Sequence, residues 1–187
     1  MEIAQKRWDS IAKPLHSLGK LETLLIQIAG ITGNAEVDLS RRGLIAMCAD
    51  NGVVEEGVTQ TGQEVTAIVA ENFLKYDTAV GVMCKQNHAE IFPVDMGMVT
   101  DTKVRTDHKI AYGTQNMTKG PAMTREQAVK GLEAGIDMVR ELNDKGYRIL
   151  ATGEMGIGNT TTSSAVASVL LKQPVEEMTG RGAGLTS

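Results

Sequence analysis

The chain has 187 residues, of which 42% are hydrophobic and 22% charged, a composition typical of a globular domain. The 19 Lys and Arg residues against 23 Asp and Glu give a net charge of -4. This balance favours neither a nucleic-acid partner nor a membrane surface. The sequence shows no signal segment and no apolar run of about eighteen residues, which predicts a cytoplasmic protein. Cys48 and Cys84 are predicted to be buried, reduced thiols.

The N-terminal stretch is predicted to be helical, because apolar side chains recur there every three or four residues: Leu18, Leu21, Leu25 and Ile28. Gly30 and Gly33 are expected to end this helix. We therefore predict a helical segment over residues 1–34 and an α/β nucleotide-binding domain over residues 35–187.

Strands and helices are predicted to alternate in the rest of the chain. The apolar run 43–48 is typical of a strand buried on both faces. Helical segments are expected over 65–74 and 78–86, followed by a second strand over 90–95. Residues 96–121 are predicted to form a long polar excursion with a short strand at 109–112.

A capping box predicts the start of the next helix, because Thr124 is followed three residues later by Gln127. The apolar face of this helix is expected to consist of Val129, Leu132, Ile136, Val139 and Leu142. A third strand over 147–152, a glycine-rich turn over 153–160 and a helix over 161–171 follow. The order predicts an α/β fold, a three-layer Rossmann-like parallel sheet with helices on both faces.

The glycine-rich segment 152–162, TGEMGIGNTTT, gives the strongest local signal for a ligand site. Gly156 and Gly158 would let the backbone approach a ligand, and free N–H groups of the following helical turn would face it. An anion is expected there, most naturally a phosphate, with Asn159, Thr160 and Thr161 as further donors. The segment lacks the Lys of a Walker loop and the third glycine of a dinucleotide fingerprint. The alternative is a tight turn without a ligand.

Other polar residues are predicted at the same edge of the sheet. Glu154 is a candidate to contact a sugar hydroxyl or a base, or it is a solvated loop carboxylate. Acceptors and amides that could bind a heterocycle or ribose, or be solvated, follow two strands: Asp50, Asn51, Glu55, Glu56, Gln63 and Asp95. Arg181, between glycines, is placed to meet a phosphate. The histidines show no metal-ligand spacing, so no metal site is expected.

Several segments in order along the chain resemble the nicotinate-nucleotide:dimethylbenzimidazole phosphoribosyltransferase family. They are KPLHSLGKLE, CADNGVVEEGVTQTGQEVT, AVGVMC, VDMGM, GEMGIGNTTTSSAV and TGRGAGL. The resemblance spans nearly the whole chain but covers only the first part of a family member. It implies phosphoribosyl transfer from nicotinate mononucleotide to dimethylbenzimidazole in cobalamin biosynthesis, without a metal or other cofactor, by a homodimer.

The resemblance also implies roles for particular residues. Gly156 and Gly182 match glycines whose backbone meets the nucleotide phosphate, Glu154 matches an active-site carboxylate, and Gln63 matches a residue of the benzimidazole pocket. The family's general-base glutamate and a phosphate-contacting lysine would lie beyond Ser187. Leu15 and His16 replace the usual proline and glycine.

The resemblance further implies that the small helical domain at the N-terminus is incomplete and that the chain is truncated. A truncated enzyme that binds nicotinate mononucleotide but turns it over poorly is the leading hypothesis. The alternatives are a non-catalytic nucleotide-binding module and an unrelated α/β enzyme that acts on a phosphosugar.

Overall fold

The computed structural model describes residues 1–183, which divide into two compact units, Met1–Arg41 and a second unit that begins at Arg42. The first unit contains helix α1, Glu2–Ser10, and helix α2, Lys20–Thr32. Residues 35–41, expected in the α/β domain, lie in this first unit. Helix α2 ends at Gly33, whose φ of 69° is left-handed, while Gly30 lies inside the helix.

The first unit is held by few buried groups. Ala4 of α1 and Ala29 of α2 are buried, whereas the expected apolar face is partly open, with Leu21 52% exposed. Glu22 of α2 is also buried, and its carboxylate pairs with the Lys13 ammonium at 2.9 Å. The Lys13 side chain lowers the pKa of Glu22.

The second unit is built on a parallel sheet of three strands in the order β2-β1-β3. Strand β1, Arg42–Ala49, pairs in parallel with β2, Ala89–Gly97, and with β3, Ile149–Met155. The α/β prediction is confirmed, although β3 continues through Glu154, a residue expected in the turn.

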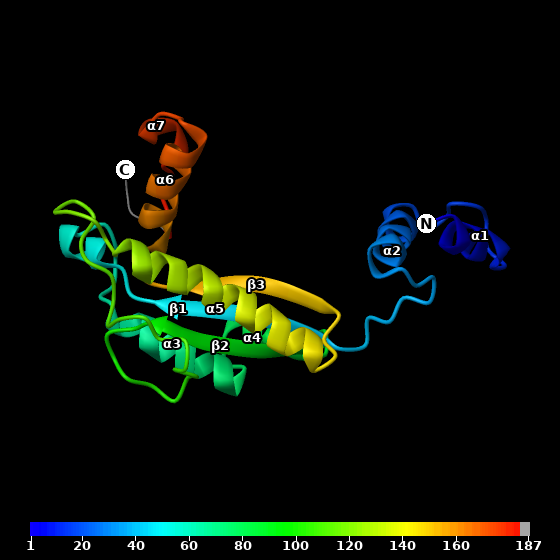
Figure 1. Ribbon diagram of the computed structural model, residues 1–187, viewed down its shortest axis with the longest axis horizontal. Coiled ribbons are helices and arrows are strands. Elements are labelled where there is room, and N and C mark those ends of the chain that lie inside the picture. The colour runs from blue at the N-terminus through cyan, green and yellow to red at the C-terminus, as the bar shows by residue number, and fades with distance from the viewer. Residues whose placement is uncertain (184–187) are drawn as a thin grey trace. The chain divides into compact units, whose positions relative to one another are not determined.

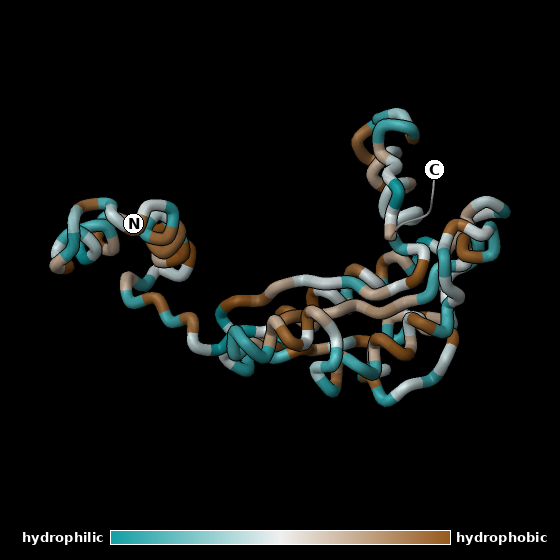
Figure 2. The backbone as a smooth tube through the Cα atoms, turned by 180° about the vertical axis from the view of Figure 1, so that it is seen from behind, coloured by the Kyte–Doolittle hydropathy of each residue, from teal (hydrophilic) through white to brown (hydrophobic). Residues whose placement is uncertain are grey.

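Helices cover both faces of this sheet (Figure 1). Helices α3, Glu64–Lys75, and α4, Ala79–Gln86, pack on one face, where Phe73 and Cys84 cluster with Ala46 of β1. Helix α5, Arg125–Asp144, packs on the other, where Met138 and Leu142 join a second cluster. Figure 2 shows hydrophobic stretches along the sheet. A 3₁₀ helix η1, Gly52–Glu56, helix α6, Asn159–Leu171, and helix α7, Val175–Met178, complete the unit.

Helix α5 begins with the predicted capping box, because Thr124 and Gln127 exchange both hydrogen bonds. Its predicted apolar face is wrong. Leu142 is buried, but the other members of that face are 43–71% exposed: Val129, Leu132, Ile136 and Val139. The buried residues of α5 are Ala134, Met138 and Leu142, and the last two pack in the cluster that contains Ile45 of β1.

The long excursion after β2 is fastened to the sheet without the strand predicted at 109–112. Single backbone bonds hold it, with the N–H of Ile110 donating to Met96 and that of Gly113 to Gly97. An isolated bridge joins Val94 to Arg105. The described residues include no helix long and apolar enough to span a membrane.

Arg105 clamps this excursion to α5. Its guanidinium contacts the Glu141 carboxylate at 2.7 Å and also pairs with Asp107. The hydrogen bond from Arg105, supported by Lys145, lowers the pKa of Glu141 to about 2. The folded state therefore binds this proton less tightly than the unfolded chain, whose Glu titrates near pH ~4.3.

Replacing Glu141 by Gln is expected to lower the free energy of unfolding by about 1 kcal/mol at pH 6, since the pair is partly exposed. The difference from the wild type is present above pH ~4.3 and vanishes as the pH falls through the folded pKa of about 2. Urea unfolding at several pH values measures it. Glu126→Gln removes an exposed pair on the same helix and serves as the control. A pH-independent difference would contradict the assignment.

Candidate functional site

The candidate site lies at the carboxyl edge of the sheet, where β1 ends at Ala49 and β3 at Met155. Residues 156–158 connect β3 to helix α6 directly above the end of β1. Ligands of open parallel α/β sheets bind at this edge, because loops and helix N-termini converge there.

Glycines are required at both ends of this connection. A Cβ atom on Gly156 would collide with the carbonyl oxygen of Ala49 and lie 2.9 Å from Nδ2 of Asn51. Gly158 has a left-handed φ of 85° and directly precedes α6. A Cβ atom there would lie 2.9 Å from Val54. The sequence predicts that these glycines let the backbone approach a ligand. In the structure they let the loop approach the residues at the end of β1.

The N-terminus of α6 has no side-chain cap from any residue that the structure describes. Two of its first amides are used within the turn, because Asn159 N–H donates to Gly156 and Thr161 N–H to Gly158. The expectation of free first-turn amides is thus wrong for these two. The groups that remain available to an anion at the start of α6 are the positive end of the helix dipole and the side chain of Thr160.

Gly182 comes back to the same helix turn from the far end of the second unit. It has a left-handed φ of 58°, and a Cβ atom on it would lie 2.9 Å from Oγ1 of Thr160. The neighbouring Arg181 is exposed. The structure therefore brings Gly182 to the first turn of α6.

Glu154 lies on β3 beside this helix terminus. Its side chain is accessible to solvent, yet partial burial raises the pKa of its carboxyl group, and a hydrogen bond from Asn159 offsets part of that rise. A carboxylate whose pKa is raised accepts and returns protons nearer neutral pH than an ordinary glutamate.

Gln63, the residue directly before α3, lies at the same edge of the sheet. Its amide Nε2 donates to the backbone carbonyl of Asn51 at 3.0 Å. Asn51 in turn contacts the glycine loop, because its Nδ2 donates to the carbonyl of Ile157. Gln63, Glu154 and the glycine loop thus border one region at the end of the sheet.

The acidic residues of this edge are engaged in the fold. Asp50 and Asp95 are fully buried, and Oδ2 of Asp50 accepts the N–H of Val99 at 2.8 Å. Oδ1 of Asp95 accepts the N–H of Met98, and its other oxygen lies 3.1 Å from the Lys109 ammonium. These carboxylates hold the excursion after β2, so their predicted contact with a heterocycle is not favoured.

Glu55 and Glu56 are tied to the same excursion further along. The Lys119 ammonium lies 2.6 Å from Glu55, and this contact lowers the pKa of that carboxyl group. The Asn116 amide donates to Oε1 of Glu56 at 2.6 Å. Both glutamates remain exposed, so the alternative of a solvated acidic loop agrees with the structure, which adds these contacts with the excursion.

Two threonines were missed by the sequence analysis. Oγ1 of Thr66 in α3 accepts the N–H of Ile157, and Oγ1 of Thr162 in α6 donates to Oδ1 of Asn51. Their signal is weak, because a hydroxyl inside a helix usually bonds its own backbone.

The cysteines are free and buried, as predicted. Burial raises the pKa of Cys48 to about 12, so this thiol is unreactive at neutral pH. Among residues 1–183 no group of His, Cys, Asp and Glu is arranged to hold a metal ion.

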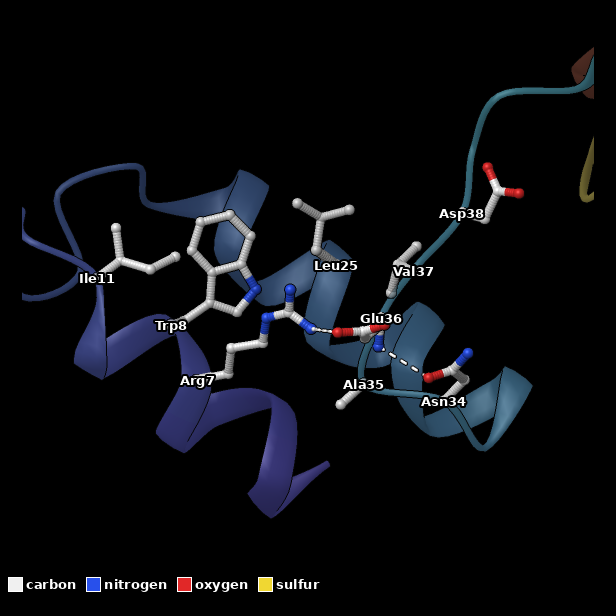
Figure 3. A pocket seen from close by; sticks show the side chains of 9 residues that line it. All are labelled: Arg7, Trp8, Ile11, Leu25, Asn34, Ala35, Glu36, Val37 and Asp38. Carbon is white, nitrogen blue, oxygen red and sulfur yellow. Dashed lines mark hydrogen bonds and ion pairs between the residues drawn. The ribbon is translucent and has the colours of Figure 1, made fainter.

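A separate cavity of about 590 Å³ lies wholly within the first unit (Figure 3). Trp8, Ile11 and Leu25 provide apolar walls. Arg7 and Glu36 face each other across it in an ion pair of 2.9 Å. All of its lining residues lie between 7 and 38, so it is formed by the helical unit alone.

The sheet order and the glycine loop at the carboxyl edge define an open parallel α/β fold, in which this edge is the usual place for a ligand. A family model described as a phosphoribosyltransferase matches residues 1–187. The chain belongs to this phosphoribosyltransferase family.

Named relatives agree with this family. The chain is 51% identical over 188 residues to the nicotinate-nucleotide–dimethylbenzimidazole phosphoribosyltransferase of Ruminiclostridium cellulolyticum, covering 100% of this chain and 53% of that protein. The same-named protein of Clostridium acetobutylicum is 50% identical, with the same coverage. The chain therefore spans about half the length of the curated relatives it matches.

Solved structures show the same fold. The crystal structure of CobT from Thermus thermophilus superimposes with a TM-score of 0.88 at 36% identity, covering 98% of this chain and 56% of that one. The crystal structure of nicotinate-nucleotide–dimethylbenzimidazole phosphoribosyltransferase from the same organism gives a TM-score of 0.86 at 35% identity. The superposition covers 97% of this chain and 56% of the chain in that structure.

Replacing Gly156 by Ala is expected to destabilise the protein by about 2 kcal/mol, because the added methyl group overpacks the contact with β1. Gly153→Ala on the preceding strand β3 is the control, since its Cβ would meet nothing closer than 3.5 Å. Thermal unfolding of both variants measures the difference. Equal melting temperatures for the two variants would contradict this account of the loop.

Proposed function

We propose that this chain takes part in phosphoribosyl transfer from nicotinate mononucleotide to dimethylbenzimidazole, which gives α-ribazole phosphate and nicotinate in cobalamin biosynthesis. The observation that carries the proposal is the convergence of Gly156, Gly158, Glu154 and Gln63 on one edge of the sheet. The names of the relatives support the substrates.

The reaction sets three tasks for such a site. The bond between the anomeric carbon and the nicotinate nitrogen breaks, a nitrogen of dimethylbenzimidazole attacks that carbon with inversion, and the other ring nitrogen loses its proton. The phosphate must be anchored so that the two centres meet, and positive charge at the sugar must be tolerated.

We assign the phosphate to the glycine loop and the residues around the start of α6: Gly156, Gly158, Asn159, Thr160, Arg181 and Gly182. Gly182 and Thr160 support this assignment by their closeness. Gln63 is assigned to the benzimidazole side, where its carbonyl oxygen can accept while its Nε2 is held by Asn51.

Glu154 is assigned as the carboxylate that receives or shares the proton, which its raised pKa supports. The resemblance puts the family's general base outside these residues, so we propose that this chain binds the nucleotide and turns it over slowly. A non-catalytic nucleotide-binding module is the alternative, and product formation separates the two.

Mixing the purified chain with nicotinate mononucleotide and dimethylbenzimidazole is expected to release nicotinate and α-ribazole phosphate slowly, as followed by chromatography. Glu154→Gln is expected to reduce that rate by about 100-fold, because it removes the proton acceptor. Nucleotide affinity, measured by calorimetry, is expected to change little. Binding without any product would favour the non-catalytic module, and no binding of either compound would overturn the proposal.

We also propose that the chain forms a homodimer in the cytoplasm. The exposed apolar stripe of α5 supports self-association, because its members are spaced symmetrically about position 134: Val129, Leu132, Ile136 and Val139. Two copies of α5 packed antiparallel about a twofold axis would therefore place Leu132 against Ile136 and Val129 against Val139 of the other copy.

Light scattering after size exclusion is expected to give twice the chain mass of 20.0 kDa for the wild type. Leu132→Glu is expected to give the monomer mass, because a charge would be buried at the centre of the stripe. Val82→Glu places the same charge on an exposed apolar position of α4 and is expected to leave the mass unchanged. Identical masses for all three proteins would contradict the α5 interface.

A further inference from the structure

Asn51 connects parts of the second unit that are far apart in the sequence. It follows Asp50 just after the end of β1, and it is only 8% exposed. Its side-chain Nδ2 donates to the carbonyl of Ile157 at 3.1 Å, and its Oδ1 accepts from Oγ1 of Thr162 at 3.1 Å. One amide therefore bridges the glycine loop and the first turns of α6.

The glycine loop also packs on Asn51 sterically. The Nδ2 atom of Asn51 lies 2.9 Å from the position that a Cβ atom on Gly156 would take. The Cβ atom of Asn51 lies 3.5 Å from the corresponding position on Gly158. The two glycines lie on either side of Ile157, whose carbonyl is the acceptor. The loop path is thus defined by Asn51 through both contact and hydrogen bonding.

The backbone of Asn51 makes a different connection. Its carbonyl oxygen accepts from Nε2 of Gln63 at 3.0 Å. The side chain of Asn51 therefore faces the predicted phosphate loop, while its backbone holds the residue predicted to meet the benzimidazole. Replacing the side chain of Asn51 therefore alters its contact with the glycine loop directly. The backbone carbonyl that holds Gln63 stays in place.

An amide is the group that this position needs. Asn carries a donor NH₂ group and an acceptor oxygen on a short side chain, and both groups are used here. An ionised Asp has the same shape but only acceptors, so one of its oxygens would face the lone pairs of the Ile157 carbonyl. A buried pair of acceptors without a proton between them is unfavourable.

From these contacts we infer that Asn51 is a positioning residue for the nucleotide phosphate, which holds residues 156–158 and the start of α6 in their binding geometry. The inference rests on the proposed function, because it takes the glycine loop as the phosphate site. Asn51 acts through the loop and not by touching the substrate. Its side chain serves nucleotide binding selectively over benzimidazole binding.

The test compares the affinities of Asn51→Asp and the wild type for each substrate by calorimetry. Nicotinate mononucleotide is expected to bind about tenfold more weakly to the variant, as for the loss of one hydrogen bond with its partner left buried. Dimethylbenzimidazole is expected to bind within about twofold of the wild type. Equal weakening for both substrates would indicate a merely structural role and overturn the inference, as would no weakening for either.

Two further variants sharpen the comparison. Asn87→Asp makes the same exchange at the end of α4, where Nδ2 donates to the carbonyl of Met83, and it is expected to change neither affinity. Thr162→Val removes the hydroxyl partner of Oδ1 and is expected to weaken nucleotide binding in the same selective way. It provides the test if Asn51→Asp does not fold, and unchanged nucleotide affinity in Thr162→Val would then overturn the inference.

Amide hydrogen exchange without any ligand separates this inference from the proposed function. Asn51→Asp is expected to speed exchange at the N–H groups of Ile157 and Asn159, which donate to Thr66 and Gly156 in the wild type. Unchanged exchange would overturn the positioning role even if the substrates bind. Faster exchange in a protein that binds no nucleotide would support the positioning of the loop and reject the proposed function alone.

Discussion

The close packing of the β3–α6 connection on the end of β1 is the constraint on which the candidate site depends. No side chain fits at position 156 without displacing the Ala49 carbonyl or Asn51, and position 158 needs a left-handed backbone. Because the loop lies flat against β1, the start of α6, Glu154 and Gln63 come to one edge of the sheet. The candidate site is therefore built on a connection that packs closely on the end of the sheet.

Local sequence signals were sufficient for much of the second unit. The apolar runs and the Thr124 capping box predicted the parallel strands and the start of α5, because strand burial and helix capping depend on neighbouring residues. The burial of α5 was not predictable in this way. Its more regular aliphatic stripe faces outward, and only tertiary packing shows that Met138 and Leu142 lie against the sheet.

The candidate site was predicted in part for a related reason. The glycines and Glu154 are adjacent in the chain, so their pattern is visible in the sequence. The roles of Asp50, Asp95 and Asn51 depend on partners outside their own segments, such as Val99 for Asp50 and Ile157 for Asn51. Spacing along the chain carries no information about such partners. The sequence therefore left the two carboxylates open between a ligand contact and solvation, and did not predict the loop that they hold.

The two edges of the sheet differ in what they offer to another strand. Beside β2, the bridge from Arg105 to Val94 and the backbone bonds of the excursion occupy part of the outer edge. Strand β3 pairs only with β1 among the residues that the structure describes, and much of it is exposed. An additional strand, whether from a longer chain or from another molecule, would extend this sheet at β3. Such an extension would lengthen the carboxyl edge of the sheet on the side of Glu154.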